Sequence, residues 1–221
     1  MSDDLALQAR VMEELAWDPA VDPARIGVAA RHGVVTLSGI VESFAAKAAA
    51  ERAAGRVRGV RAIATEIEVR LPADHHRADA EIAERALRLL EWDVEVPHER
   101  IRLRVEHGLV TLTGEVGYHF QRAAAEADLR RLGGVRGVTN LIRVVPAEAP
   151  AVEPDLVRRQ IEAALRRNAE IEAGGISVEI IAGRAILRGR VETWTERALA
   201  ETAALAAPGV IEVEHALEVA P

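Results

Sequence analysis

The chain alternates between a helical and a strand-like spacing of apolar residues, and it does so three times. Each stretch opens with apolar residues four positions apart, as at Leu7, Val11 and Leu15, which predicts the buried face of an amphipathic helix. Apolar and polar residues then alternate over residues 26–30 and again over 34–41, the pattern of two half-buried strands. A second helix with an alanine-rich face and a third strand complete each stretch, so the predicted order is α-β-β-α-β.

The three stretches are copies of one unit, in register and without gaps. Three segments read HGVVTLSGIV, HGLVTLTGEV and AGRAILRGRV, and their first glycines, Gly33, Gly108 and Gly183, lie 75 residues apart. A period this long suits small tandem domains better than solenoid repeats. We therefore predict an α+β fold of three tandem sandwiches, each with two helices packed on a three-stranded mixed sheet. The predicted domain boundaries are residues 1–72, 73–146 and 147–221.

Local signals within the unit predict how its elements begin and end. His32 and His107 each precede the glycine of a tight hairpin turn, where histidine tolerates a positive φ. Thr193 and Glu196 form a capping-box pattern at the second helix of the third copy. Acidic residues near the start of the first helix are expected to cap it or to interact with its dipole; they are Asp4, Asp79 and Asp155. The glycines predicted as C′ residues of the second helices are Gly59, Gly134 and Gly209.

Composition and charge exclude several classes of protein. The 221 residues include 28 Lys and Arg and 35 Asp and Glu, and the net charge of −7 argues against a general nucleic-acid binder. There is no cysteine, which excludes a disulfide framework, a thiolate metal site and a cysteine nucleophile. No apolar run approaches the length of a membrane span, and the acidic start of the chain lacks the basic region of a signal peptide. We therefore expect a cytoplasmic protein as the chain is written, or a periplasmic one if a leader has been removed.

The repeated unit resembles a known bacterial module. Its order α-β-β-α-β and its hairpin pattern G-x-[VA]-x-L-x-G-x-V are similar to those of the BON domain, named for osmotically inducible and nodulation proteins. The second and third copies also carry Gly-Val-x-x-Val, beginning at Gly134 and Gly209. The resemblance covers nearly the whole chain, which is similar to OsmY-like bacterial stress proteins with several BON domains. It implies a non-enzymatic module with proposed roles in binding phospholipid or membrane surfaces during osmotic or envelope stress.

Arginines recur near the end of the second helix in the first two copies. The candidate residues are Arg56, Arg58, Arg61, Arg130, Arg131 and Arg136. Cations at a helix C-terminus interact favourably with the helix dipole, which gives the cluster a structural interpretation. The functional interpretation is a patch that faces anions, either lipid headgroups or an acidic protein partner.

Tryptophan also recurs at an equivalent position. Trp17 and Trp92 each follow the first helix, and Arg167 replaces them in the third copy. We expect these rings to cover the open edge of a small core. The alternative is that they anchor the protein at a lipid interface or on a partner. Trp194 aligns instead with Phe44 and His119 at the start of the second helix, and for it too we expect a core edge.

No pattern of residues points to catalysis or to a metal. His75–His76 stands in a linker without acidic or histidine partners at helical spacing, and His215 aligns with a threonine and an asparagine in the other copies. Glu42 and Glu192 are equivalent, but Gly117 stands between them in the second copy, which argues against a catalytic carboxylate. We predict no enzyme activity, no catalytic residue, no metal site and no cofactor.

The leading hypothesis is a non-catalytic stress protein that presents shallow surfaces to an anionic phospholipid surface, an envelope component or a protein partner. One alternative is a cytoplasmic sensor of a small ligand or ion. Another is a structural module for protein interaction or self-assembly. The sequence leaves the ligand, the oligomeric state and the packing between domains open.

Overall fold

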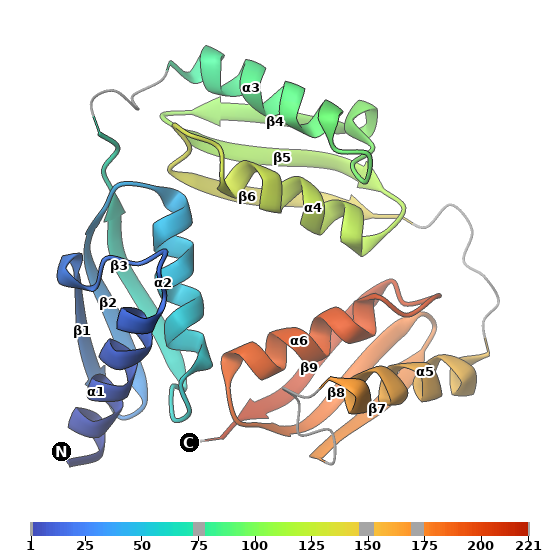
Figure 1. Ribbon diagram of the computed structural model, residues 1–221. Coiled ribbons are helices and arrows are strands. Elements are labelled where there is room, and N and C mark those ends of the chain that lie inside the picture. The colour runs from blue at the N-terminus through green and yellow to red at the C-terminus, as the bar shows by residue number, and fades with distance from the viewer. Residues whose placement is uncertain (1, 73–77, 146–152, 169–174, 221) are drawn as a thin grey trace.

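The computed structural model describes residues 2–72, 78–145, 153–168 and 175–220, which form three separate α-β-β-α-β units (Figure 1). Unit one contains α1 (Ser2–Trp17), β1 (Ile26–Arg31), β2 (Val34–Val41), α2 (Phe44–Arg56) and β3 (Ala62–Val69). Unit two contains α3 (Asp79–Trp92), β4 (Ile101–Glu106), β5 (Leu109–Val116), α4 (His119–Arg130) and β6 (Gly137–Val144). Unit three contains α5 (Pro154–Arg167), β7 (Ile176–Ile181), β8 (Arg184–Val191), α6 (Trp194–Leu205) and β9 (Glu212–Val219). The predicted linkers fall largely outside the described residues.

Each unit has one three-stranded mixed sheet, as predicted. In unit one the order is β1-β2-β3, with β1 antiparallel and β3 parallel to the central strand β2. The other two sheets repeat this order and register. The parallel pair requires a crossover, which α2, α4 and α6 supply. The predicted fold class is confirmed.

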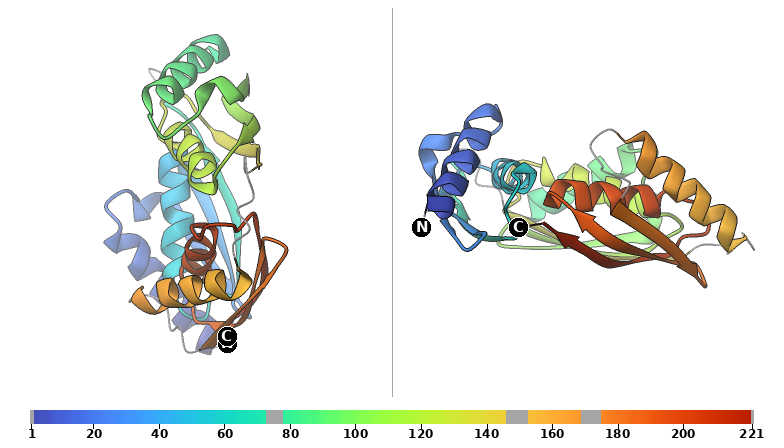
Figure 2. Two further views of the ribbon diagram at one scale, coloured as in Figure 1. Left: turned by 90° about the vertical axis from the view of Figure 1, so that its right-hand side faces the viewer. Right: turned by 90° about the horizontal axis from the view of Figure 1, so that it is seen from below.

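Both helices of a unit pack on one face of its sheet, and Figure 2 shows the sheets with their helices on one side. The predicted helix faces are buried, for example Leu7, Val11 and Leu15 of α1, each at most 4% exposed. The alanine-rich faces of the second helices let these helices lie close to the sheet, because alanine adds little bulk at the contact. Each unit thus has its own core, formed by the apolar face of the sheet and both helices.

The hairpin turns have the predicted left-handed backbone. His32 and His107 have φ of 51° and 50°, and the following glycines are also at positive φ. Asp4 accepts a hydrogen bond from the backbone N–H of His32 at 2.7 Å, and Asp79 accepts the equivalent bond from His107 at 2.8 Å. These aspartates therefore fasten the first helix to the hairpin turn. Asp155 does not: it is offset by one residue and contacts Arg158 instead.

Two predictions about helix ends can be compared with the structure. Thr193 does cap α6, since its Oγ1 accepts a hydrogen bond from the N–H of Glu196 at 3.0 Å. The C′ assignment of the three glycines is wrong, because α2 already ends at Arg56 and Gly59 follows three residues later. Gly59 instead has φ of 89° inside the turn closed by the Val60 N–H and the Val57 carbonyl oxygen. Gly134 and Gly209 occupy the same place in the equivalent turns.

Glycine in the middle of each central strand allows a close approach of two backbones. Gly39, Gly114 and Gly189 have φ of 137°, 138° and 139°. A Cβ added at these positions would lie 2.0, 2.2 and 1.8 Å from the carbonyl oxygen of the residue just before β1, β4 or β7. No side chain fits there, which explains why the sequence repeats this glycine in all three units.

Candidate functional site

Trp17 and Trp92 end the first helices of units one and two, and both are exposed. Their exposed fractions are 77% and 86%, so the prediction that these rings cover a core edge is wrong. Val21 and Val96, 75 residues apart, are buried instead: they are 7% and 4% exposed and belong to the cores of units one and two. Each valine follows its tryptophan by four residues, and neither lies on a face that the apolar spacing predicts to be buried.

The exposed apolar surface extends beyond the two rings. Met12 and Leu87 are equivalent residues on the outer side of α1 and α3, and each is 53% exposed. Val94, two residues after Trp92, is 99% exposed. Unit three has Glu162 and an arginine in place of the methionine and the tryptophan. Units one and two therefore share two exposed apolar positions on the first helix, where unit three has charged residues.

Arg56 serves an internal ion-pair network. Its guanidinium donates to Glu14 at 2.6 Å and to Asp18 at 3.2 Å, both at the end of α1. The hydrogen bond to Glu14 raises the pKa of Arg56, while the pKa of Asp18 is lowered first by the Ala20 N–H and then by the arginine. The residue therefore joins α2 to α1, which favours a structural role over an anion-facing one.

The equivalent arginine of unit two has different neighbours. Arg131 is exposed and acts electrostatically on Asp128, whose carboxyl group faces Asp93. Burial raises the pKa of Asp128, the Asp93 charge raises it further, and Arg131 opposes the shift. The Oδ2 atom of Asp128 is buried and has no hydrogen-bond donor among the described residues. Two carboxyl groups thus meet beside the start of the loop that follows Trp92.

We expect the Asp128→Asn variant to be more stable than the natural protein near neutral pH. A raised pKa in the folded state means that Asp128 favours folding when protonated and that this contribution is lost as pH rises through its folded-state pKa. Asparagine imitates the protonated acid, so the melting temperature of unit two should rise at about pH 7. The gain should vanish below about pH 3, where aspartate is largely protonated in both states. Calorimetry at both pH values tests this, and an equal or lower melting temperature at neutral pH would contradict it.

The remaining arginines do not form one patch with Arg56. Arg58 makes an ion pair with Glu192 of unit three, and Arg130 binds Glu126 one turn earlier on α4. Arg61 and Arg136 use their backbone N–H groups to bond the carbonyl oxygens of Gly33 and Gly108, at 2.7 and 2.8 Å. The structure therefore places five of the six predicted arginines in ion pairs, in a contact between units or at hairpin turns, while Arg131 is exposed and acts on Asp128.

Two open depressions beside these hairpin turns carry charges of both signs. The one in unit one, of about 760 Å³, is lined by Arg10, Arg58 and Arg61 but also by Asp3 and Asp4. The one between units one and two, of about 390 Å³, combines the following charged residues: Glu68, Arg70, Asp79 and Arg136. Neither depression has the uniformly basic lining that a patch for anions would need.

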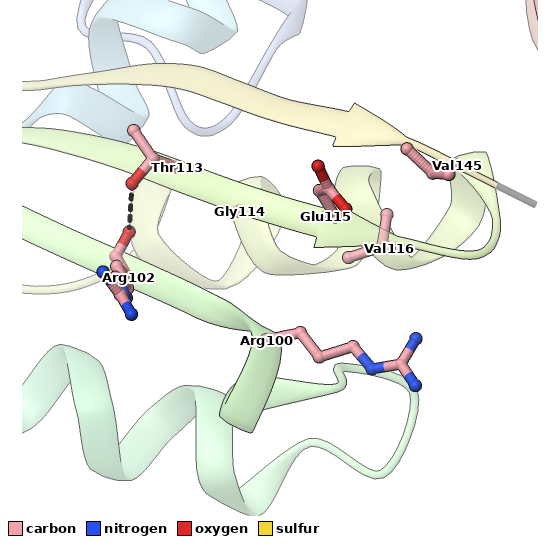
Figure 3. A pocket seen from close by; sticks show the side chains of 7 residues that line it. All are labelled: Arg100, Arg102, Thr113, Gly114, Glu115, Val116 and Val145. Atoms are coloured by element: carbon pink, nitrogen blue, oxygen red, sulfur yellow. Dashed lines mark hydrogen bonds between the residues drawn. The ribbon is translucent and has the colours of Figure 1, made fainter.

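A third depression, of about 780 Å³, lies on unit two where β4 and β5 approach β6 (Figure 3). Arg100 and Arg102 line it, but Figure 3 shows their side chains apart, with that of Arg100 extending away from Arg102. The carbonyl oxygen of Arg102 accepts a hydrogen bond from Thr113, and Glu115 pairs with Arg143. The lining groups do not converge on a common point, so the depression does not arrange polar groups as a catalytic site does.

One position in this region differs among the three units. In unit one Arg25 binds Glu42 at 2.6 Å. Unit two retains the arginine, Arg100, but has Gly117 at the position of the glutamate. Unit three retains the glutamate, Glu192, without that arginine. The Arg25–Glu42 ion pair of unit one therefore has no equivalent in units two and three.

Among the described residues no three His, Asp or Glu side chains are grouped so that they could hold a metal ion. His32 and His107 lie in hairpin turns, while His75–His76 lies outside the described residues. Within the same residues, no helix is long and apolar enough to cross a bilayer.

Comparison with known proteins identifies the repeated unit. A family model described as the BON domain matches residues 3–70, 78–146 and 155–221. The chain belongs to the BON domain family. Each α-β-β-α-β unit is one BON domain, and the family expected from the hairpin pattern is confirmed.

The chain also shows similarity to individual proteins. Osmotically-inducible protein Y of Escherichia coli K12 is 31% identical over 143 residues, which are 62% of this chain and 71% of that protein. Among solved structures, the C-terminal domain of CdsD, a structural protein of the type III secretion system of Chlamydia trachomatis, is 14% identical. That match covers 97% of this chain and 98% of the other, with a TM-score of 0.27. A second CdsD structure is 15% identical, covers 98% and 93%, and has the same score. These scores are too low to support any shared arrangement of domains.

Proposed function

We propose that this BON protein is a non-catalytic, stress-associated binding protein whose first two domains bind an anionic phospholipid surface through Trp17 and Trp92. The observation that carries the proposal is the exposure of both rings, 77% and 86%, at one repeated position. Tryptophan is favoured at membrane interfaces, where its apolar ring meets lipid and its N–H meets water. A role in stress is supported by the relation to osmotically-inducible protein Y.

The surroundings of the rings support a lipid surface over a deep ligand site. Met12 and Leu87 add exposed apolar area on the same helices, and Val94 adds more beside Trp92. Trp17 and Trp92 stand at the ends of their helices and line none of the three depressions described above, so they suit a broad apolar layer. Unit three, with charged residues at the equivalent positions, is not part of the proposed surface.

Positive charge for anionic headgroups is available near each ring. Arg52 of α2 is exposed and acts on Asp18, the residue after Trp17. Arg131 is exposed and acts on Asp128, which faces the residue after Trp92. Because carboxylates accompany both arginines and the chain carries a net charge of −7, the attraction should be local and sensitive to salt.

Co-sedimentation with vesicles tests the proposal. We expect the full chain to pellet with vesicles of phosphatidylcholine and phosphatidylglycerol, and less with phosphatidylcholine alone. The double variant Trp17→Ala/Trp92→Ala should bind at least about tenfold more weakly, since burying one large apolar side chain is worth roughly 2 kcal/mol. Its matched control is Phe120→Ala, which removes a ring that is 53% exposed in unit two, away from the proposed surface.

Equal binding of the double variant and the natural chain would refute the lipid proposal. Pelleting that ignores both lipid charge and salt would refute its anionic part. Stabilisation by a small solute or cation without vesicles would instead favour the sensor. We propose a cytoplasmic location, so the lipid surface would be the inner face of the plasma membrane, and fractionation of cells that express the native protein tests this.

A further inference from the structure

Three residues at one repeated position each contact the next unit. Phe44, His119 and Trp194 begin α2, α4 and α6. Phe44 packs against the cores of both unit one and unit two, and the Nε2 atom of His119 lies 2.7 Å from the carbonyl oxygen of Ile211 in unit three. Trp194 packs against the core of unit one. The contacts therefore run from one to two, from two to three and from three back to one, and Figure 1 shows α2, α4 and α6 facing the middle of the molecule.

The contact between units three and one is the one that closes this cycle. Trp194 lies over Gly55 of α2, where an added Cβ would be 3.5 Å from the tryptophan Cβ and 3.8 Å from the Thr195 hydroxyl. The Arg58–Glu192 ion pair joins the same two units. The guanidinium carbon of Arg197 lies 5.0 Å from the centre of the Trp194 ring. We call this contact, formed by Gly55, Arg58, Glu192 and Trp194, the closing seam.

Two residues of the closing seam, Gly55 and Glu192, differ from the equivalent positions of the other units in ways that favour contact between units one and three. Gly55 stands inside a helix, where glycine is unfavourable, and the equivalent residues of α4 and α6 are Arg130 and Leu205. Only in unit one does another unit's tryptophan lie against this position. Glu192 also differs, because its equivalent Glu42 binds an arginine of its own unit whereas Glu192 binds Arg58 across the seam.

We propose that the face of α2 around Gly55 is a docking site for α6 of the same chain, and that this docking closes the three BON domains into a ring in solution. Gly55 gives the site its specificity, because a Cβ there would already touch Trp194 at van der Waals distance, and a side chain that extends beyond Cβ would occupy the place of the tryptophan. The occupant is unit three of the same molecule, since it is already tethered and its effective concentration is therefore high. This inference is independent of the proposed lipid binding.

The buried indole N–H of Trp194 suggests two substitutions that should change the strength of the closing seam in different ways. Its Nε1 atom is buried without an acceptor among the described residues, so the N–H weakens the contact that the ring makes. Trp194→Phe should therefore keep or tighten the docking of unit three on unit one. The equivalent residue of unit one, Phe44, already packs against the core of unit two as a phenylalanine. Trp194→Ala removes the ring and should loosen it.

Distance measurement between spin labels tests the ring in the full chain. The chain has no cysteine, so Arg31→Cys in unit one and Glu218→Cys in unit three direct two labels to exposed positions that are not among the four seam residues. We expect one narrow distance distribution that persists after dilution with unlabelled protein. Gly55→Leu introduces the residue that unit three has at the equivalent position, Leu205. We expect this variant to give a broad distance distribution in place of the narrow one. Its control is Gly133→Leu, at an exposed glycine of unit two with no atom within 4 Å of an added Cβ.

Tryptophan fluorescence gives a second measurement that does not depend on labels. In a Trp17→Phe/Trp92→Phe background only Trp194 emits, and Gly55→Leu should raise its quenching by acrylamide severalfold while circular dichroism stays unchanged. Failure of Gly55→Leu to alter both the distance distribution and the quenching would overturn the proposal. A distance that disappears on dilution with unlabelled protein would also overturn it, because docking would then occur between chains.

Discussion

Replacing Gly114 with alanine is expected to unfold unit two. The new Cβ would lie 2.2 Å from the carbonyl oxygen of Arg100, and the backbone at φ of 138° is itself costly for alanine. A domain of this size is stabilised by about 3–10 kcal/mol, and we expect a loss of about 4 kcal/mol or more. Hydrogen exchange should show the amides of β5 unprotected, while those of β2 and β8 stay protected because each unit has its own core.

The control for this variant is Gly133→Ala in the same unit. Gly133 has no atom within 4 Å of an added Cβ, so a change within about 0.5 kcal/mol is expected. If Gly114→Ala were as stable as Gly133→Ala, the close approach of the two strands would not be a requirement of the fold. Loss of protection in β8 would mean that the units do not fold separately.

Truncation of Leu112 to alanine should have the next largest effect. Leu112 is fully buried at the centre of β5, facing both helices of unit two. Leu→Ala substitutions in such places cost about 2–5 kcal/mol, from lost burial and from the cavity left behind. Leu109 stands three residues earlier in the same strand on the open face and is 56% exposed, so Leu109→Ala should cost less than about 1 kcal/mol. Denaturant unfolding of both variants measures the difference, and equal midpoints would contradict the assigned faces of β5.

The fold was predictable because local signals and burial agree in three copies. The period-two and period-four spacings identified the faces that pack, as Leu37 and Leu7 show. The offset of 75 residues distinguished structural positions from variable ones, so the turn residue His32 could be recognised without coordinates. Prediction failed at Gly59, because a glycine after a helix indicates a positive φ but does not indicate whether a helix end or the following turn needs it.

The candidate surface was harder to predict, because it depends on which side chains remain exposed and make no contact within the fold. Trp17 was expected at a core edge because large rings are usually buried, yet it is exposed, and Val21, four residues later, is the buried residue. Arg56 and Arg131 are equivalent in sequence, but only Arg56 has both Glu14 and Asp18 beside it. The docking of Trp194 on another unit could not be inferred, since a single-domain pattern carries no information about neighbouring domains.

Glu42, Gly117 and Glu192 occupy one equivalent position in the three units, and this position has a different role in each unit. In unit one Glu42 pairs with an arginine of its own unit. Unit two has glycine at this position, and in unit three Glu192 pairs with Arg58 of unit one. The domains are therefore no longer interchangeable, although each keeps the same fold. A shortened chain that ended after unit two would carry an uncovered face on α2, and a chain with its units in another order would bring the wrong partners together.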